Sequence, residues 1–159
     1  MIPVVTQIAE ETHAFGAKLA AQLLPGDVVL LLGQMGAGKS VLARGIAIGL
    51  GITETITSPT YTILQVYDSG RLPFYHFDWY RIRSAEEIYE LSMEEYLGGN
   101  GIAVIEWPER AEKAIPTEHL RIAITPIGIN TRKIMLKPMG SFHSLAGQPL
   151  QERALIAYP

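Results

Sequence analysis

Residues 33–40 read Gly-Gln-Met-Gly-Ala-Gly-Lys-Ser and fit the phosphate-loop pattern G-x-x-x-x-G-K-[ST]. A phosphate loop requires a strand that leads into it and a helix that leaves it. Residues 28–32 form a continuous apolar run, which is typical of a strand buried on both faces of a parallel sheet. After the loop, apolar residues recur at helical spacing as far as Leu50. The motif and its surroundings predict a nucleotide triphosphatase.

Each part of the loop predicts a contact with the nucleotide. The glycines allow a tight turn whose backbone N–H groups converge on phosphate oxygens, and the helix N-terminus adds the positive end of its dipole. Lys39 is predicted to reach the β- and γ-phosphates, and the Ser40 hydroxyl is predicted to bind a bridging Mg²⁺. The predicted nucleotide-binding residues of the loop are Gly33, Met35, Gly36, Ala37, Gly38, Lys39, Ser40 and Val41.

Composition limits the architecture and the compartment. The chain has 159 residues, of which 48% are hydrophobic, so we expect one domain over residues 1–159. It has no Cys, which excludes disulfides and zinc–thiolate sites and favours a reducing compartment. The first residues lack a basic region, and no apolar run approaches the length of a membrane span. We therefore expect a cytoplasmic protein that does not contact membranes.

The net charge of −3 is distributed unevenly along the chain. Residues 84–118 contain nine Glu and two basic residues, a balance of −7, whereas residues 119–159 have a balance of +4. The acidic stretch is either a solvated helix face or a docking surface for a basic partner. No basic stripe is interleaved with aromatic residues, so the sequence does not support tight nucleic-acid binding by this chain alone.

The remaining patterns predict an α/β fold of the P-loop NTPase class: a mixed sheet flanked by helices, with a β-hairpin after the P-loop helix. The turn Asp68-Ser69-Gly70 separates the two hairpin strands, and Ser84 begins the capping-box pattern S-x-x-E. From Ser144 onward only a weak terminal helix is expected. The predicted elements are helices over 9–24 and 84–96, hairpin strands over 61–67 and 72–78, a buried strand over 101–106, and a strand pair over 120–127 and 132–139.

Two acidic residues follow apolar strands and are candidates for the metal site. Asp78 ends one strand and Glu106 ends another, and ligands in α/β sheets bind at the carboxyl ends of the strands. One acid is expected to hold Mg²⁺ and the other to orient the attacking water, with Glu106 favoured on the metal. Alternatively, either acid caps a turn or pairs with Arg81 or Arg110.

Other residues near these acids have more than one interpretation. Thr60 either senses the γ-phosphate or donates a turn hydrogen bond beside a proline. Arg81 could neutralise charge in the transition state, although a structural role is more common. A structural role is favoured for His76. For Trp79 and Trp107, packing is favoured over anchoring a partner.

The motifs together resemble the TsaE (YjeE) family of bacterial ATPases. Beyond the phosphate loop, the resemblance rests on S-P-T-Y-T at 58–62, H-F-D-W-Y-R at 76–81, Glu90-Leu91 and I-E-W-P-E at 105–109. It extends from about residue 6 to about residue 127. The final thirty or so residues match no motif of the family.

The resemblance implies an ATPase that acts in biosynthesis of N6-threonylcarbamoyladenosine in tRNA. Family members bind a complex of TsaB and TsaD and use ATP and Mg²⁺ to reset it between turnovers, so tRNA is contacted only through the complex. The resemblance also implies that Lys39 and Ser40 bind phosphate and Mg²⁺, that Glu106 ligates Mg²⁺, and that Asp78 supports hydrolysis. Trp107 is implied to lie beside the nucleotide, and we add Thr60 as a catalytic candidate.

The chain departs from the usual family loop at three positions. Gln34 replaces Asp and removes a charge, Met35 replaces Leu, and Ser40 replaces Thr while keeping the hydroxyl. Any role of the usual Asp is therefore in doubt here. Trp79 stands where Leu is usual, which predicts a change of packing.

Other functions for a phosphate loop have weaker support. A small-molecule or nucleotide kinase usually has an arginine-rich lid, and none is evident. The N-K-x-D motif of GTPases and the L-S-G-G-Q signature of transporter ATPases are absent. A non-hydrolytic module, gated by nucleotide binding alone, is the alternative from another class.

Overall fold

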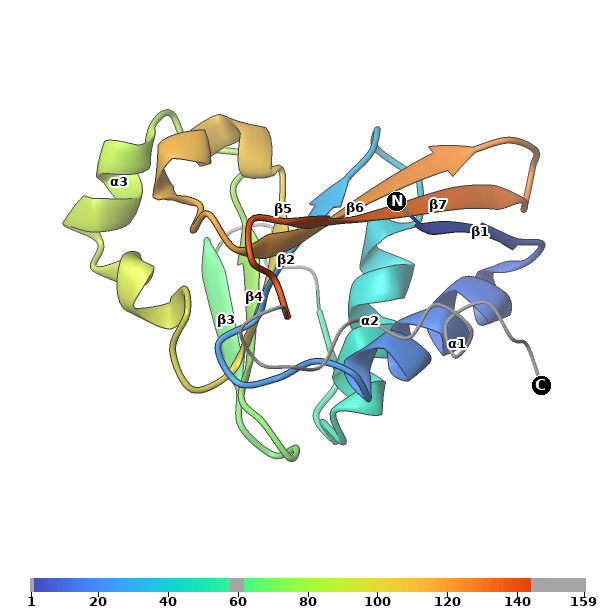
Figure 1. Cartoon of the computed structure of the whole chain (residues 1–159), viewed down its shortest axis with the longest axis horizontal. Coiled ribbons are helices and arrows are strands. Elements are labelled where there is room, and N and C mark those ends of the chain that lie inside the picture. Colours follow the sequence, from blue (N-terminus) through green and yellow to red (C-terminus); the bar gives the residue numbers. More distant parts are fainter. Residues whose placement is uncertain (1, 58–61, 144–159) are drawn as a thin grey trace.

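A computed structural model describes residues 2–57 and 62–143 (Figure 1). These residues form one mixed sheet with helices on both faces, which confirms the predicted P-loop NTPase class. The strands are β1 (Ile2–Thr6), β2 (Val28–Leu32), β3 (Leu64–Tyr67), β4 (Phe74–Asp78), β5 (Ile102–Glu106), β6 (His119–Pro126) and β7 (Arg132–Met139). The helices are α1 (Ala9–Ala20), α2 (Lys39–Gly49) and α3 (Ala85–Glu90), with 3-10 helices η1 (Met93–Tyr96) and η2 (Pro108–Ala114).

The sheet is parallel at its centre and antiparallel toward both edges. Its strand order is β1-β7-β6-β2-β5-β4-β3. Strand β2 pairs in parallel with β5 and β6, and β5 pairs in parallel with β4. The antiparallel pairings of β3 with β4 and of β6 with β7 confirm the predicted hairpin and strand pair. The phosphate loop thus leaves the centre of the sheet, where β2 ends.

Strand β2 is buried on both sides because a helical layer covers each face. Val29 and Leu31 belong to the core beneath α1 and α2, whereas Val28 and Leu30 belong to the core on the α3 side. Figure 1 shows the two layers on opposite sides of the sheet. This alternation explains why β2 reads as an unbroken apolar run.

Three elements differ from their predicted extents. Helix α1 ends at Ala20, because the chain must turn before Pro25, although Leu23 remains buried in the core. The helix that begins after Ser84 stops at Glu90, and Ser92 has a left-handed backbone (φ 54°) that separates α3 from η1. Strand β1 was not predicted from the sequence. The predicted weak helix after residue 143 lies outside the described residues.

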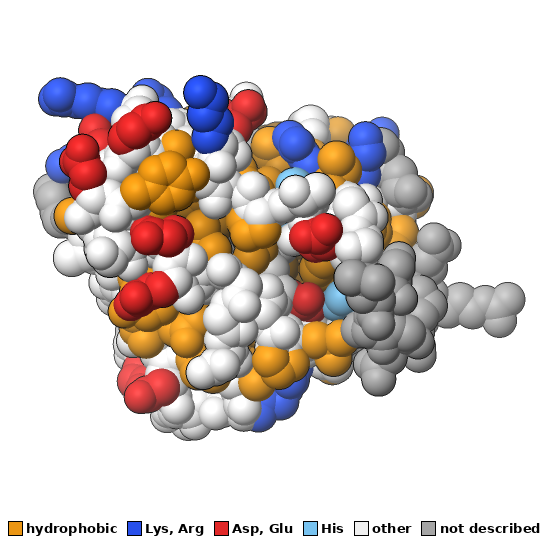
Figure 2. All heavy atoms as spheres, turned by 60° about the vertical axis from the view of Figure 1, so that its left-hand side comes forward, with side chains coloured by type: hydrophobic (Ala, Val, Ile, Leu, Met, Phe, Trp, Pro, Cys, Tyr) orange, Lys and Arg blue, Asp and Glu red, His pale blue; other side chains and the backbone are white. Residues whose placement is uncertain are grey.

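The surface on the α3 side is acidic, as the charge distribution predicts. Figure 2 shows carboxylate side chains gathered there beside exposed hydrophobic side chains. The exposed acids are Glu86, Glu90, Glu94, Glu95, Glu109 and Glu112. Within residues 2–57 and 62–143, no helix has the length and apolar character needed to cross a bilayer.

Helices α1 and α2 pack closely because glycines lie where they cross. A Cβ atom on Gly45 would lie 2.1 Å from the carbonyl oxygen of His13, and one on Gly16 would lie 2.6 Å from that of Leu42. Both distances are too short for any side chain. The close contact fixes the first turns of α2, which carry the end of the phosphate loop.

We expect Gly45→Ala to destabilise the protein by about 2 kcal/mol in equilibrium denaturation, because the methyl group forces α1 and α2 apart. The greater helix propensity of Ala, about 1 kcal/mol, offsets only part of this cost. Ile48→Ala on the same helix serves as a control; Ile48 is 53% exposed, so its replacement should change stability by less than about 0.5 kcal/mol. A Gly45→Ala protein as stable as wild type would contradict the close contact.

Candidate functional site

A cavity of about 470 Å³ opens at the carboxyl ends of β2, β4 and β5. The phosphate loop and the start of α2 form one wall, and residues following β4 and β5 form the opposite wall. The lining residues are Met35, Gly36, Gly38, Lys39, Ser40, Val41, Thr62, Ile63, Asp78, Tyr80, Arg81, Glu106 and Trp107. Its volume is in the range of small-molecule and cofactor sites.

The phosphate loop has the backbone shape that its glycines predict. Gly36 and Gly38 have φ angles of 80° and 109°, in the left-handed region that side chains disfavour. Gly38 directly precedes α2, so the helix N-terminus faces the cavity. The side chain of Lys39 folds back over the loop and donates a hydrogen bond from Nζ to the carbonyl oxygen of Gly33 at 2.7 Å.

Lys39 also lies against Trp107 on the far wall. Its Nζ atom is 3.8 Å from the centroid of the indole ring, within cation–π range. Trp107 has a left-handed backbone (φ 58°), which is unusual for a bulky residue and aims the ring across the cavity. Tyr80 packs edge-on against the same ring at 5.0 Å. Trp107 thus lies in the cavity wall beside the predicted nucleotide-binding residues of the phosphate loop, whereas Trp79 is fully buried, consistent with the packing role favoured for it.

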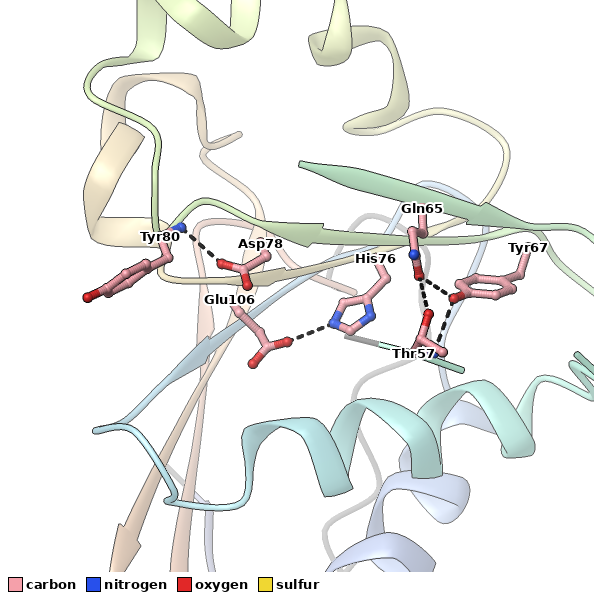
Figure 3. A network of polar contacts seen from close by, with 7 residues as sticks. All are labelled: Thr57, Gln65, Tyr67, His76, Asp78, Tyr80 and Glu106. Atoms are coloured by element: carbon pink, nitrogen blue, oxygen red, sulfur yellow. Dashed lines mark hydrogen bonds and ion pairs between the residues drawn. The ribbon is translucent and has the colours of Figure 1, made fainter. Parts of the chain in front are cut away.

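Asp78 and Glu106 lie side by side because β4 and β5 are parallel and in register there. Glu106 is 5% exposed, and its Oε2 atom is 2.8 Å from Nε2 of His76 (Figure 3). Asp78 accepts a hydrogen bond from the backbone N–H of Tyr80 at 2.9 Å. The strand register therefore brings both predicted acids to the cavity.

The charges of Lys39 and Asp78 are both partly removed from water. Burial lowers the pKa of Lys39, although Glu106, Glu109 and Asp78 oppose this effect. Burial raises the pKa of Asp78, opposed by the Tyr80 hydrogen bond and reinforced by the charge of Glu106. The site thus holds a cation and carboxylates whose charges are poorly solvated, a common arrangement in functional sites.

The donor atoms suit Mg²⁺ when phosphates complete its coordination. The Ser40 hydroxyl and the Glu106 carboxylate line the same cavity and supply oxygen ligands. Among the described residues, no group of three or more His, Cys, Asp or Glu side chains could hold a metal alone. Mg²⁺ is usually bound by one or two protein oxygens together with nucleotide phosphates, so this sparse set fits the ion.

The structure adds Arg132, which the sequence analysis missed. Its Nε atom donates a hydrogen bond at 2.8 Å to the carbonyl oxygen of Ala37, within the phosphate loop. Its guanidinium also donates to the carbonyl oxygens of residues 128, 129 and 131. Arg132 thus ties the loop to the start of β7. No local sequence pattern reveals this role, because Arg132 and Ala37 are 95 residues apart in the chain.

Most of the predicted site residues meet in the cavity. Gly33 and Ala37 do not line it, although they accept the hydrogen bonds from Lys39 and Arg132. Thr60 lies outside the described residues. The cavity also includes Thr62, Ile63, Tyr80 and Arg81, which were not assigned to nucleotide binding, although the motifs at 58–62 and 76–81 contain three of them.

Comparisons with known proteins agree with these motifs. A sequence profile of the family described as "Threonylcarbamoyl adenosine biosynthesis protein TsaE" matches residues 6–134. The chain is 40% identical over 141 residues to the tRNA threonylcarbamoyladenosine biosynthesis protein TsaE of Bacillus subtilis, covering 89% of this chain and 88% of the relative. It is 40% identical over 130 residues to the protein of that name from Treponema pallidum, covering 82% and 96%.

A solved structure has the same fold. The crystal structure of Bacillus subtilis YdiB superimposes with a TM-score of 0.79 at 36% sequence identity. The match covers 92% of this chain and 94% of the crystallised chain. The architecture described above is therefore that of a known protein over almost its full length.

We expect Arg132→Gln to weaken nucleotide binding about 10-fold, because a hydrogen bond from a charged group is worth about 1.5–3 kcal/mol. Calorimetric titration with ATP would measure the effect. Lys133→Gln is the matched control: Lys133 is the next residue, is exposed, and should leave affinity unchanged. Equal affinities for both variants would show that Arg132 does not shape the loop.

We expect Asp78→Asn to raise the melting temperature of the nucleotide-free protein in EDTA at neutral pH. The folded state raises the pKa of Asp78, so ionising this carboxyl costs folding free energy above its usual pKa of 3.8. The advantage of Asn should shrink as the pH falls and disappear below 3.8, where Asp78 is protonated in both folded and unfolded chains. A variant that melts below wild type at neutral pH would contradict this burial cost.

Proposed function

Because the chain belongs to the TsaE family and has a role in tRNA threonylcarbamoyladenosine biosynthesis, we propose that it is a Mg²⁺-dependent ATPase of that pathway. One observation carries the proposal: Lys39 and Ser40 of the phosphate loop face Glu106 and Asp78 across one cavity. A strand-end carboxylate beside a phosphate loop is the arrangement that nucleotide hydrolysis requires.

Binding of the triphosphate begins with the loop. Its backbone N–H groups, including those at the N-terminus of α2, donate hydrogen bonds to the phosphate oxygens. Lys39 gives up its hydrogen bond to the Gly33 carbonyl and donates to phosphate oxygens in its place. Trp107 lies over the same ammonium and closes the cavity from the other side. Bound Mg²⁺ would neutralise charge on the phosphates, held by the Ser40 hydroxyl and the Glu106 carboxylate.

Hydrolysis needs a group that orients the attacking water. Asp78 is our candidate because it lines the cavity beside Glu106 and its pKa is raised by burial. The Tyr80 N–H fixes one oxygen of the Asp78 carboxyl, which leaves the other for water. We also propose Thr60 as a sensor of the γ-phosphate, since it belongs to the 58–62 motif between α2 and β3.

We further propose that turnover is slow in the isolated chain and rises when TsaB and TsaD bind. The cavity is open in the isolated chain, and partner contacts are a common way to complete such a site. The partners carry the tRNA, so this chain contacts tRNA only through them. We propose the cytoplasm as the location, and a single functional domain over the chain.

We expect Lys39→Ala to weaken ATP binding about 10- to 100-fold, because it removes charge-assisted hydrogen bonds to phosphate. Glu106→Ala should weaken Mg²⁺-dependent ATP binding about 10-fold and lower turnover about 100-fold, so that it spares binding more than turnover, because its carboxylate acts mainly through the metal. ATP affinity and phosphate release, each with and without TsaB and TsaD, would measure both effects.

Glu112→Ala is the control for this pair, since Glu112 is an exposed glutamate on η2 that does not line the cavity. Normal hydrolysis by Glu106→Ala with both partners present would refute the metal assignment. Tight ATP binding without any turnover, even with the partners, would favour the non-hydrolytic module. Transfer of phosphate to a small acceptor would favour a kinase.

A further inference from the structure

Among the described residues, a single side chain forms a hydrogen bond with the carboxylate of Glu106. Glu106 is 5% exposed and His76 is 1% exposed, so the contact between them is shielded from water. Within the described part of the chain, the Nε2 atom of His76 is the only hydrogen-bond partner of this carboxylate, at 2.8 Å from Oε2. A buried carboxylate needs such a partner, because leaving it unpaired costs free energy.

The hydrogen of this bond belongs to His76. An ionised carboxylate only accepts hydrogen bonds, so the donor is the imidazole Nε2–H. The other ring nitrogen, Nδ1, is buried and has no partner among the described residues, so a hydrogen there would lack an acceptor. The surroundings therefore select the tautomer that donates to Glu106.

His76 does not reach the cavity itself. It is absent from the cavity wall, whereas Glu106 is part of it. Its ring stacks on Phe74 at 5.7 Å within the rigid strand β4, and its backbone pairs with Gln65 of β3. Figure 3 shows the imidazole directed toward one oxygen of Glu106, with the second oxygen on the side away from His76. The hydrogen bond of His76 to a residue of the cavity wall is the one to Glu106.

The position of Glu106 also matters for Lys39. The two charges attract each other, since Glu106 raises the pKa of Lys39. Yet no ion pair joins them in the described part of the chain, where the partner of the Glu106 carboxylate is His76. A carboxylate free to rotate would swing toward the ammonium and compete with phosphate for it. The bond from His76 opposes that movement.

We propose that His76 is a positioning residue: its Nε2–H holds one oxygen of Glu106 so that the other is presented to Mg²⁺ and Lys39 stays free for phosphate. This inference rests on the proposed function, because it concerns the metal ligand of that site. Groups that orient a metal ligand typically change metal affinity 10- to 100-fold when they are removed.

The test compares His76→Gln with His76→Asn. The amide nitrogen of Gln reaches the place of Nε2 and can donate to Glu106, whereas the shorter Asn cannot; both are uncharged amides, so they are matched in polarity. The affinity of a non-hydrolysable ATP analogue would be measured in EDTA and in saturating Mg²⁺. The affinity in Mg²⁺ divided by the affinity in EDTA reports the contribution of the metal alone.

In His76→Asn we expect this ratio to fall about 10-fold, with the affinity in EDTA unchanged. His76→Gln should stay within about threefold of wild type. A merely structural role would lower the affinity in EDTA as well, and that result would overturn the inference. A ratio in His76→Asn equal to that of wild type would also overturn it.

Two further measurements separate this inference from the proposed function. If the wild-type protein binds the analogue equally well with and without Mg²⁺, the proposed function fails before His76 is considered. Nitrogen-15 NMR of the metal-free wild-type protein reports the tautomer directly and needs no variant that folds. Hydrogen on Nε2 of His76 supports the inference, and hydrogen on Nδ1 alone refutes it.

Discussion

The parallel pairing of β5 with β2 on one side and with β4 on the other is the constraint on which the site depends. Its register sets Glu106 opposite Leu31 on one side and opposite Asp78 on the other. Two carboxylates and the start of the phosphate loop consequently meet at one edge of the sheet, although they come from three separate segments. This edge is where ligands bind in α/β sheets generally. A shift of one residue would turn Glu106 toward the opposite face.

The parts of the site that follow from local patterns were predictable from the sequence. The phosphate loop is a contiguous string, and Asp78 and Glu106 each end an apolar run. The motifs also identified the family, which the comparisons confirm. The central strands were predictable for the same reason, because burial on both faces leaves an apolar run that needs no knowledge of neighbouring strands.

Features that depend on distant partners were not predictable in this way. The alternation around His76 indicated burial and a structural role, but its partner Glu106 lies 30 residues further on. Strand β1 was missed because Pro3 weakens its pattern; the strand tolerates proline since it lies at the edge of the sheet. The helix predicted after Ser84 was too long because acidic residues with high helix propensity continue past Ser92. The left-handed backbone of Ser92 separates these residues from α3.

The hydrogen bond from Arg132 to the carbonyl of Ala37 has a consequence for biogenesis. Arg132 also pairs in register with Thr6, so the loop is braced by strands from both ends of the described chain. Contacts of such long sequence separation form late, because loop closure must precede them. A nascent chain emerging from the ribosome therefore cannot present a fully braced phosphate loop until synthesis has passed β7. Formation of the finished loop is then coupled to synthesis of a strand that lies about ninety residues further along the chain.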